Sequence, residues 1–327
     1  MNIASCRICN NACDNTSYIA REMMMGYRDR FEYFKCARCG CLQIKEIPEN
    51  LSKYYPDGYY SFGKQDYSKP GLFKAFRRHE RAKNWLYERN IIGMSLSMGR
   101  KMPYYFDWFK KARIRFDSEI LDIGCGAGQL LLELQKYGFS NLTGTDLFIE
   151  DDIFYKNRVK VLKKPLADLK GQFDFIMLHN SFEHMPQPLS TLKELCRLLK
   201  TNRHALIRTP IVSSFAWRKY GVDWVQLDAP RHLFLHTIES IQMLAGQAGF
   251  EITDIVFDST EFQFLGSEQY SNNIPLRDSK SYCVDPQGSI FSKEQITAFK
   301  NKAVELNKDK DGDSACFYLY KNGEEKR

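Results

Sequence analysis

From Ser118 onward, short apolar runs alternate with segments in which apolar residues recur every three or four positions. This alternation of strand and helix signals is typical of a parallel α/β sheet whose strands are connected by helices. The pattern predicts seven strands, at Glu119–Ile123, Asn141–Asp146, Val159–Lys163, Phe173–His179, His204–Thr209, Glu251–Asp258 and Ala315–Lys321. We therefore expect an α/β domain over residues 117–327.

The chain ahead of this domain has a different texture. Residues 72–116 carry apolar side chains at mixed spacings of three and four, which predicts two or three helices with a break near Gly93 to Pro103. Residues 48–71 are rich in proline and glycine, which predicts a loop-rich connection. That loop holds a tyrosine cluster that can stack on a sugar or base or cover the core: Tyr54, Tyr55, Tyr59 and Tyr60. The expected division is residues 1–47, 48–116 and 117–327.

Composition narrows the class of protein. Of the 327 residues, 43% are hydrophobic and 27% are charged, which argues against a disordered or coiled-coil chain. No apolar stretch reaches the length of a membrane-spanning helix, and the N-terminus lacks the basic start and apolar core of a signal peptide. We expect a cytoplasmic protein, with no expectation about its oligomeric state.

The positive charge is concentrated in one segment. The formal net charge is +7, but residues 64–115 contain 14 Lys and Arg against four acids, so this segment carries +10 and the remainder carries −3. A basic helical segment suits a phosphate-bearing substrate, the surface of an anionic membrane, or nucleic acid. A solvated helical face with no ligand is the plain alternative.

The cysteines are also concentrated. Six of the ten lie in the first 41 residues, and four of them form the pairs Cys6–Cys9 and Cys36–Cys39, each with two residues between the cysteines. Two such pairs have the spacing of a four-cysteine zinc ribbon, in which a closed set of thiolates makes the metal structural. Cys13 or Cys41 can replace a neighbouring ligand, and reduced thiols or disulfides remain as alternatives.

The glycine-rich segment Ile120–Gln129 is a buried strand that runs into a turn and then a helix. Glycines allow the backbone to approach a ligand closely at the carboxyl edge of an α/β sheet. The third glycine of the dinucleotide fingerprint is missing, since Gln129 stands in its place. Asp122 lies inside the strand and suits a ligand with a cationic amino acid part. Asp146, at the end of the next strand, can accept hydrogen bonds from ribose hydroxyls.

These residues resemble the class I S-adenosylmethionine-dependent methyltransferases. Ile120 to Gly128 match the family's first strand and loop, Phe173 to Ile176 its fourth strand, and His179 to Pro188 its Glu-His loop. The resemblance implies a Rossmann-like sheet of seven strands. It also implies S-adenosylmethionine as cofactor, with the ribose on Asp146 and the adenine beside Leu147. The cofactor-binding residues are then Asp122, Gly124, Gly126, Gly128, Asp146, Leu147 and His179.

The cysteine-rich start, together with Trp224–Leu233 and Ala248–Phe250, is similar to a bacterial group that includes the sugar C-methyltransferases. That group implies a small acceptor: a nucleotide-linked sugar, or a precursor of a polysaccharide or glycolipid. With the basic segment, we expect this acceptor to bear a phosphate. The alternative is an RNA methyltransferase that uses the zinc ribbon and the basic segment to bind RNA. A non-catalytic module that retains the fold is a third, weaker alternative.

Methyl transfer is an in-line displacement, so the enzyme must position the acceptor and, where needed, remove a proton. His184 and His232 are the candidate bases, because imidazole titrates near neutral pH and both residues lie on loops expected at the active edge. Glu183 is the candidate for orienting or assisting them. Candidate acceptor contacts are Arg231, whose planar fork matches a phosphate, and Tyr220 and Trp224, for which packing is the alternative.

Overall fold

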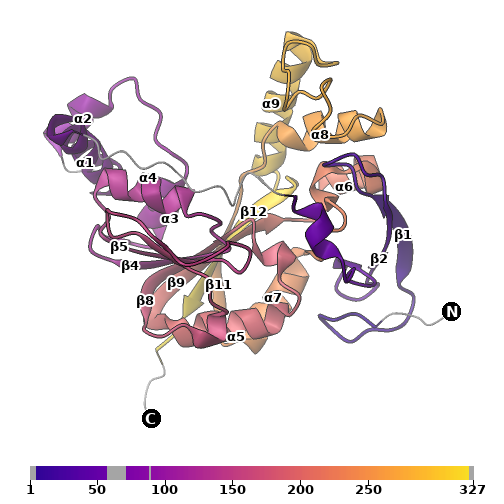
Figure 1. Ribbon diagram of the computed structural model, residues 1–327, viewed down its shortest axis with the longest axis horizontal. Helices are drawn as coiled ribbons and strands as arrows, with labels where there is room; N and C mark the ends of the chain where they lie inside the picture. Colours follow the sequence, from indigo (N-terminus) through magenta and orange to yellow (C-terminus); the bar gives the residue numbers. More distant parts are fainter. Residues whose placement is uncertain (1–4, 57–70, 88–89, 324–327) are drawn as a thin grey trace.

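The computed structural model describes residues 5–56, 71–87 and 90–323, and Figure 1 shows their arrangement around one central sheet. This sheet has eight strands in the order β11-β12-β9-β8-β4-β5-β7-β6. Their bounds are β4 Glu119–Ile123, β5 Asn141–Thr145, β6 Ile153–Phe154, β7 Lys160–Leu162, β8 Phe173–His179, β9 Leu199–Pro210, β11 Glu251–Phe257 and β12 Ser314–Lys321. The five strands from β9 to β7 run parallel, whereas β12, β11 and β6 pair antiparallel.

All seven predicted strands are present, but the strand count of seven was wrong. The eighth strand, β6, has two residues at the edge of the sheet, and Phe154 is exposed. So short an edge strand leaves no apolar alternation in the sequence. The strand expected from His204 also begins earlier, at Leu199, and its pairing with β8 shifts register between Phe173 and Phe175. Asn202 in this stretch has a φ of 58°, a backbone conformation that asparagine tolerates.

Helices cover both faces of the sheet, and the central strands β4 and β8 are accordingly buried along almost their whole length. On β8, Phe175 and Met177 face one core cluster and Ile176 and Leu178 face the other. The first cluster includes residues of α1 (Leu72–Tyr87), α3 (Tyr105–Lys111) and α4 (Gln129–Tyr137). The second includes residues of α5 (Pro188–Leu198) and α7 (Ile238–Gln247), which lie on the opposite side of the sheet in Figure 1. The remaining helices are α2 (Ile91–Ser97), α6 (Phe215–Tyr220), α8 (Phe262–Ser271) and α9 (Lys293–Lys308).

The predicted helices before the sheet are α1, α2 and α3, but the expected break is misplaced. Gly93 lies within α2, and α3 begins at Tyr105, so the break runs from Met98 to Tyr104. A Cβ on Gly93 would stand 2.2 Å from the Glu80 carbonyl oxygen of α1. Glycine here permits two helices to pack closely and does not end one. No helix in the described ranges has the length and apolar character needed to cross a bilayer.

The first 47 residues do not form a separate unit. Strands β1 (Thr16–Arg21), β2 (Arg30–Lys35) and β3 (Leu42–Ile44) form a second sheet with β10 (Phe234–Leu235), which comes from the methyltransferase-like region. The same core cluster contains Tyr33 and Leu42 as well as α5 and α7 residues. The expected boundary at residue 47 is therefore not a structural boundary, because β10 pairs with β3 across it.

Candidate cofactor and acceptor site

The glycine-rich turn between β4 and α4 has the backbone that its sequence predicts. Gly124, Gly126 and Gly128 all have positive φ values, of 71°, 55° and 80°. A Cβ on Gly124 would lie 2.4 Å from the Cβ of Ser181, so only glycine fits where this turn meets the loop after β8. The turn therefore keeps bare backbone at the carboxyl edge of the sheet.

Two buried acids flank this turn. Asp146 accepts hydrogen bonds from the N–H groups of Gly126 and Phe148, both at 2.8 Å, which orients its carboxylate at the edge of the sheet. Each carboxylate oxygen can accept a second hydrogen bond, so capacity remains for a ligand hydroxyl. Asp122 is buried inside β4, and this burial, with the charge of Asp146, raises its pKa to about 8.

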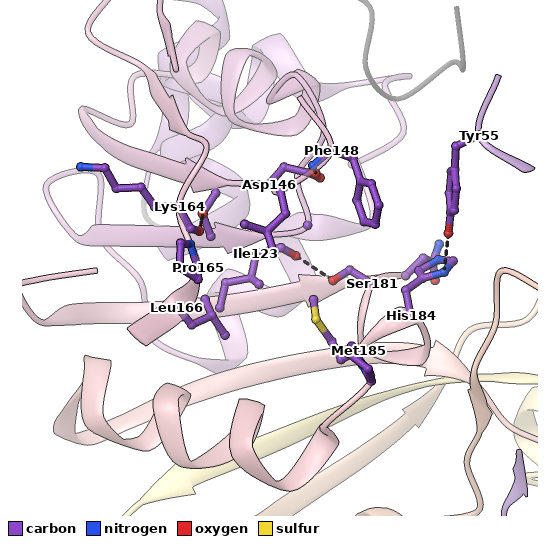
Figure 2. A pocket seen from close by; sticks show the side chains of 15 residues that line it. Tyr55, Ile123, Asp146, Phe148, Lys164, Pro165, Leu166, Ser181, His184 and Met185 are labelled. Carbon is purple, nitrogen blue, oxygen red and sulfur yellow. Dashed lines mark hydrogen bonds between the residues drawn. The ribbon is translucent and has the colours of Figure 1, made fainter. Parts of the chain in front are cut away.

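A cavity of about 300 Å³ opens at this edge, and Figure 2 shows the side chains around it. Its walls come from the loops that follow β4, β5, β7 and β8, together with Tyr55 from the segment before α1. The lining residues are Tyr55, Ile123, Gly124, Thr145, Asp146, Leu147, Phe148, Lys164, Pro165, Leu166, Asn180, Ser181, His184, Met185 and Pro186. Most of these side chains are apolar, which suits the binding of a planar nucleobase, and Asp146 provides a charged group that can accept hydrogen bonds.

The predicted bases lie together, in contact with each other. The rings of His184 and His232 are 4.8 Å apart in an edge-to-face arrangement, and His184 lines the cavity. His184 Nδ1 lies 2.8 Å from the Arg231 carbonyl oxygen, and His232 Nδ1 lies 2.7 Å from the Gln226 carbonyl oxygen. A carbonyl only accepts, so in each ring Nδ1 donates its proton and Nε2 keeps its lone pair. Burial lowers the pKa of both histidines, which keeps them neutral.

Glu183 lies behind this pair. It is fully buried, and its Oε2 accepts a hydrogen bond of 3.0 Å from the Thr209 hydroxyl. Its Oε1 has no hydrogen-bond partner within the part of the chain that the structure describes, and lies 3.9 Å from His232 Nε2. Burial raises the pKa of Glu183. A carboxyl group in this position can stabilise positive charge on the histidines.

Other sequence candidates lie away from the cavity. His179 packs against Tyr104 and Trp108 of the helical segment, and burial lowers its pKa to about 4. The Tyr220 hydroxyl donates to Glu268 at 2.7 Å, and the Trp224 indole donates to Asp313 at 2.9 Å. These three residues are not among those that line the cavity. Tyr220 and Trp224 are packing residues, which was the alternative that the sequence left open.

Arg231 corrects the expectation of a phosphate contact. Its side chain is fully buried, and its guanidinium donates to Glu22 and Asp228 carboxylates at 2.8 and 2.6 Å. A further N–H donates to the Tyr54 carbonyl oxygen at 3.2 Å. Phosphate could bind Arg231 only by displacing these partners. The Arg231 guanidinium instead binds these partners within the protein, and so joins the N-terminal sheet region to the loop that carries His232.

The four cysteines of the two pairs converge. The sulfur atoms of Cys6, Cys9, Cys36 and Cys39 lie within 4.8 Å of one another, and all four side chains are buried. The Cys6–Cys39 and Cys9–Cys36 sulfur separations are 3.6 and 3.5 Å. The backbone N–H groups of Ile8 and Arg38 donate to Cys6 and Cys36 sulfurs at 3.4 Å. Cys41 is buried outside this group, and Cys13 is exposed.

Three side chains at the cavity, those of Tyr55, Phe148 and Met185, were not among the predicted site residues. Phe148 stacks on Tyr55 with ring centres 5.2 Å apart, and the Tyr55 hydroxyl lies 3.3 Å from His184 Nδ1. The tyrosine cluster gave a signal for Tyr55, whereas Phe148 and Met185 carried none beyond their place after predicted strands. Tyr54 covers the core beside Phe31, while Tyr59 and Tyr60 lie outside the described residues.

A parallel sheet with a glycine turn after one strand and an acid ending the next defines an α/β fold that binds a nucleoside-containing ligand. Comparison with known families makes the class specific: residues 97–255 match a family described as a methyltransferase domain. The chain therefore contains an S-adenosylmethionine-dependent methyltransferase domain, and the enzyme class expected from the sequence is confirmed.

Two related proteins are themselves named as methyltransferases. The chain is 34% identical over 122 residues to human EEF1A lysine methyltransferase 2, covering 31% of this chain and 50% of the relative. It is 26% identical to a ubiquinone biosynthesis O-methyltransferase from Pseudomonas aeruginosa, covering 47% of this chain and 73% of the relative. Among solved structures, mycolic acid cyclopropane synthase CmaA1 has a TM-score of 0.41 and 17% identity, covering 78% of this chain and 100% of that chain.

Proposed function

We propose that this methyltransferase acts on a small acceptor at the mouth of the cavity, with His184 as the base. The observation that carries this proposal is the position of His184, which lines the cavity and donates its Nδ1 proton to a backbone carbonyl. Its Nε2 lone pair is then available to accept a proton from the acceptor. Glu183 stands behind it, and its carboxylate stabilises the positive charge that results.

At the same edge of the sheet, different residues bind different parts of the cofactor. When bound, S-adenosylmethionine supplies an electrophilic methyl group on a sulfonium sulfur. The Asp146 carboxylate would accept hydrogen bonds from the ribose hydroxyls, and Leu147 and Phe148 would cover the adenine. The bare backbone at Gly124 admits the amino acid part close to Asp122. The stack of Tyr55 on Phe148 reduces the access of water to the acceptor side.

For the acceptor we propose a sugar-type molecule that bears a phosphate, such as a nucleotide-linked sugar or a polysaccharide or glycolipid precursor. The support is the resemblance of residues 1–47 and 224–250 to the sugar C-methyltransferase group, together with the +10 charge of residues 64–115. Since Arg231 is occupied internally, the phosphate contact falls to other cations. RNA is the alternative acceptor, and the same basic segment is its support.

We also propose that Cys6, Cys9, Cys36 and Cys39 hold a structural zinc ion. Tetrahedral zinc with sulfur ligands at about 2.3 Å places the sulfurs about 3.8 Å apart. The two sulfur separations of 3.5 and 3.6 Å fit that spacing, as does the burial of all four side chains. Four thiolates close the coordination sphere, so this ion has no role in methyl transfer.

Calorimetry with S-adenosylmethionine tests the cofactor part of the proposal. Asp146→Ala should weaken binding about tenfold or more, because two charge-assisted hydrogen bonds are lost. Asp151→Ala, which removes an exposed acid from the same loop, is the matched control and should bind as the natural chain does. Absence of binding by the intact protein would overturn the proposal.

Transfer of a labelled methyl group to a panel of acceptors tests the substrate class. The panel contains nucleotide-linked sugars, RNA, a lysine-containing protein and a quinone precursor, since two of these classes appear in the relatives' names. Label in the sugars supports the proposed acceptor. Label in any other class, with none in the sugars, replaces it while leaving the methyltransferase activity intact.

A further inference from the structure

The helical pair α1 and α2 presents an unusual number of apolar side chains to solvent. Among the described residues, 20 large apolar side chains are exposed, and nine of these lie between Leu72 and Tyr104. Leu72 is 88% exposed, Ile91 83%, Met98 80% and Phe73 74%. Tyr104 precedes α3, and the other eight lie on α1, on α2 or directly after α2: Leu72, Phe73, Phe76, Tyr87, Ile91, Ile92, Met94 and Met98, which we name the α1–α2 surface. Such a cluster is uncommon on a protein that contacts only water.

This exposure does not reflect loose packing of the helices. Toward its C-terminal end, α1 buries Ala82 and Leu86 in the core cluster with α3 and α4. His79 Nδ1 lies 2.9 Å from the Tyr137 carbonyl oxygen at the end of α4. Gly93 of α2 fits closely against Glu80 of α1, and Asn90 donates to the Glu80 carbonyl oxygen at 3.2 Å. The pair is thus fixed to the domain, with exposed apolar side chains in the first turns of α1 and along α2, and Figure 1 places it at one end of the molecule.

Positive charge accompanies the apolar side chains. Residues 71–87 and 90–115 contain eleven Lys and Arg against two acids, Glu80 and Asp107. Five of the eleven lie on α1 itself: Lys74, Arg77, Arg78, Arg81 and Lys83. The Arg77 guanidinium lies over the Phe73 ring at 5.6 Å, so charge and apolar surface are adjacent at the start of the helix.

We propose that the α1–α2 surface binds the surface of an anionic lipid bilayer. A helix with apolar side chains on one side and Lys and Arg beside them lies in the interface, where its apolar residues enter the acyl boundary and its cations meet phosphates. Leu72, Phe73 and Ile91 are the inserting residues, and Arg77 and Lys74 contact headgroups. The methyltransferase domain is then a peripheral membrane protein, whichever acceptor it uses.

Two other occupants fit less well. RNA would use aromatic rings for stacking on bases, but five of the eight exposed side chains of this surface are Leu, Ile or Met, which do not stack. A second copy of this chain would bring two strongly positive segments together, and like charges at an interface oppose association. A bilayer with anionic headgroups satisfies both the aliphatic side chains and the positive charge.

Sedimentation of the full chain with lipid vesicles tests the proposal. Vesicles of phosphatidylcholine with about 30% phosphatidylglycerol, at about 100 mM salt, should bind the protein at least about tenfold more tightly than pure phosphatidylcholine. Phe73→Ser and Ile91→Ser together should weaken this binding about tenfold or more, and Arg77→Glu should weaken it further. These side chains are exposed, so the variants should fold, which circular dichroism verifies.

Matched controls separate this surface from general stickiness. Val304→Ser removes an exposed apolar side chain from α9, and Lys308→Glu inverts an exposed charge there. Both should bind vesicles as the natural chain does. Failure to bind anionic vesicles, or binding that Phe73→Ser and Ile91→Ser leave unchanged, would overturn the proposal. RNA binding, or a dimer, that these two substitutions abolish while vesicles remain unbound would assign the surface to that partner instead.

Discussion

The four-cysteine cluster and the cofactor edge are two sites built by opposite strategies. The cluster takes its four sulfurs from two short turns, each spanning four residues, and buries all of them. The cofactor edge takes its residues from loops after four strands and from Tyr55, and leaves a cavity of about 300 Å³ open. The first site is closed, as the proposed zinc ion requires, whereas the second has open space for a ligand that enters and leaves.

The two sites are nevertheless joined. Glu22, in the N-terminal sheet region, pairs with Arg231, and the Arg231 carbonyl oxygen accepts the Nδ1 proton of His184. The Tyr33 hydroxyl also donates to the His232 carbonyl oxygen at 2.9 Å. The N-terminal region that carries the closed site therefore also contacts the loop of Arg231 and His232, on which the orientation of His184 at the open site depends.

The largest effect should come from the closed site. Cys36→Ser removes one of four sulfurs, and should release the metal and lower the free energy of unfolding by about 3 kcal/mol or more, since the ion's binding energy stabilises the fold. Metal analysis and thermal unfolding check both effects. Cys13→Ser, at an exposed cysteine outside the cluster, should change neither. Full metal content in Cys36→Ser would contradict a four-cysteine site.

At the open site, His184→Gln should lower kcat about 100-fold or more while S-adenosylmethionine still binds, because only proton removal is lost. The dependence of activity on pH tests which protonation state of His184 is active. A neutral His184 is the active form, and burial lowers its pKa from 6.5, so activity of the natural enzyme should persist below pH 6.5 and fall at more acidic pH. His204→Gln, on β9 away from the cavity, is the control. An acid limb above pH 6.5 speaks against His184 as the base.

The link between the sites is tested by Glu22→Gln. Glu22 is fully buried and also accepts the N–H groups of Met25 and Tyr27, so this change should cost about 2 kcal/mol of unfolding free energy. If the sites are coupled, kcat should fall with little change in affinity for S-adenosylmethionine, because His184 loses its fixed orientation. Glu46→Gln, at an exposed acid in the same region, should change neither the free energy of unfolding nor kcat. Loss of stability with unaltered kcat would separate the two sites.

Asp122→Asn should alter the pH dependence of stability. The pKa of Asp122 is raised from 3.8 to about 8 in the folded protein, so unfolding releases a proton between these values. The free energy of unfolding of the cofactor-free protein should therefore fall as pH rises through this range. Asn has the same shape without the charge, and should make the fall between about pH 5 and 8 shallower. Denaturation at both pH values measures it, and a fall as steep as that of Asp151→Asn would refute it.

Local patterns predicted much of this protein because the underlying interactions are local. Strands β4 and β8 have the bounds expected from their apolar runs, and the three glycines of the turn have the positive φ values that favour glycine. The two-residue spacing also predicts that Cys6 lies near Cys9 and Cys36 near Cys39, whereas the close contacts Cys6–Cys39 and Cys9–Cys36 join turns far apart in the chain. The predictions were wrong where the sequence has no local pattern to indicate the feature. These features are the two-residue strand β6 and the close packing of two helices that explains Gly93.

The sequence by itself determined the class of enzyme, the glycine turn with Asp146, the candidate histidines and the cysteine pairs, since each depends on residues close together in the chain. Only the tertiary structure decided which of these groups meet. It enclosed Arg231 between Glu22 and Asp228, brought Tyr55 onto Phe148, and paired β10 with β3. Such contacts join residues far apart in the sequence, so their identity depends on how the whole chain packs and on which polar groups burial forces to find partners.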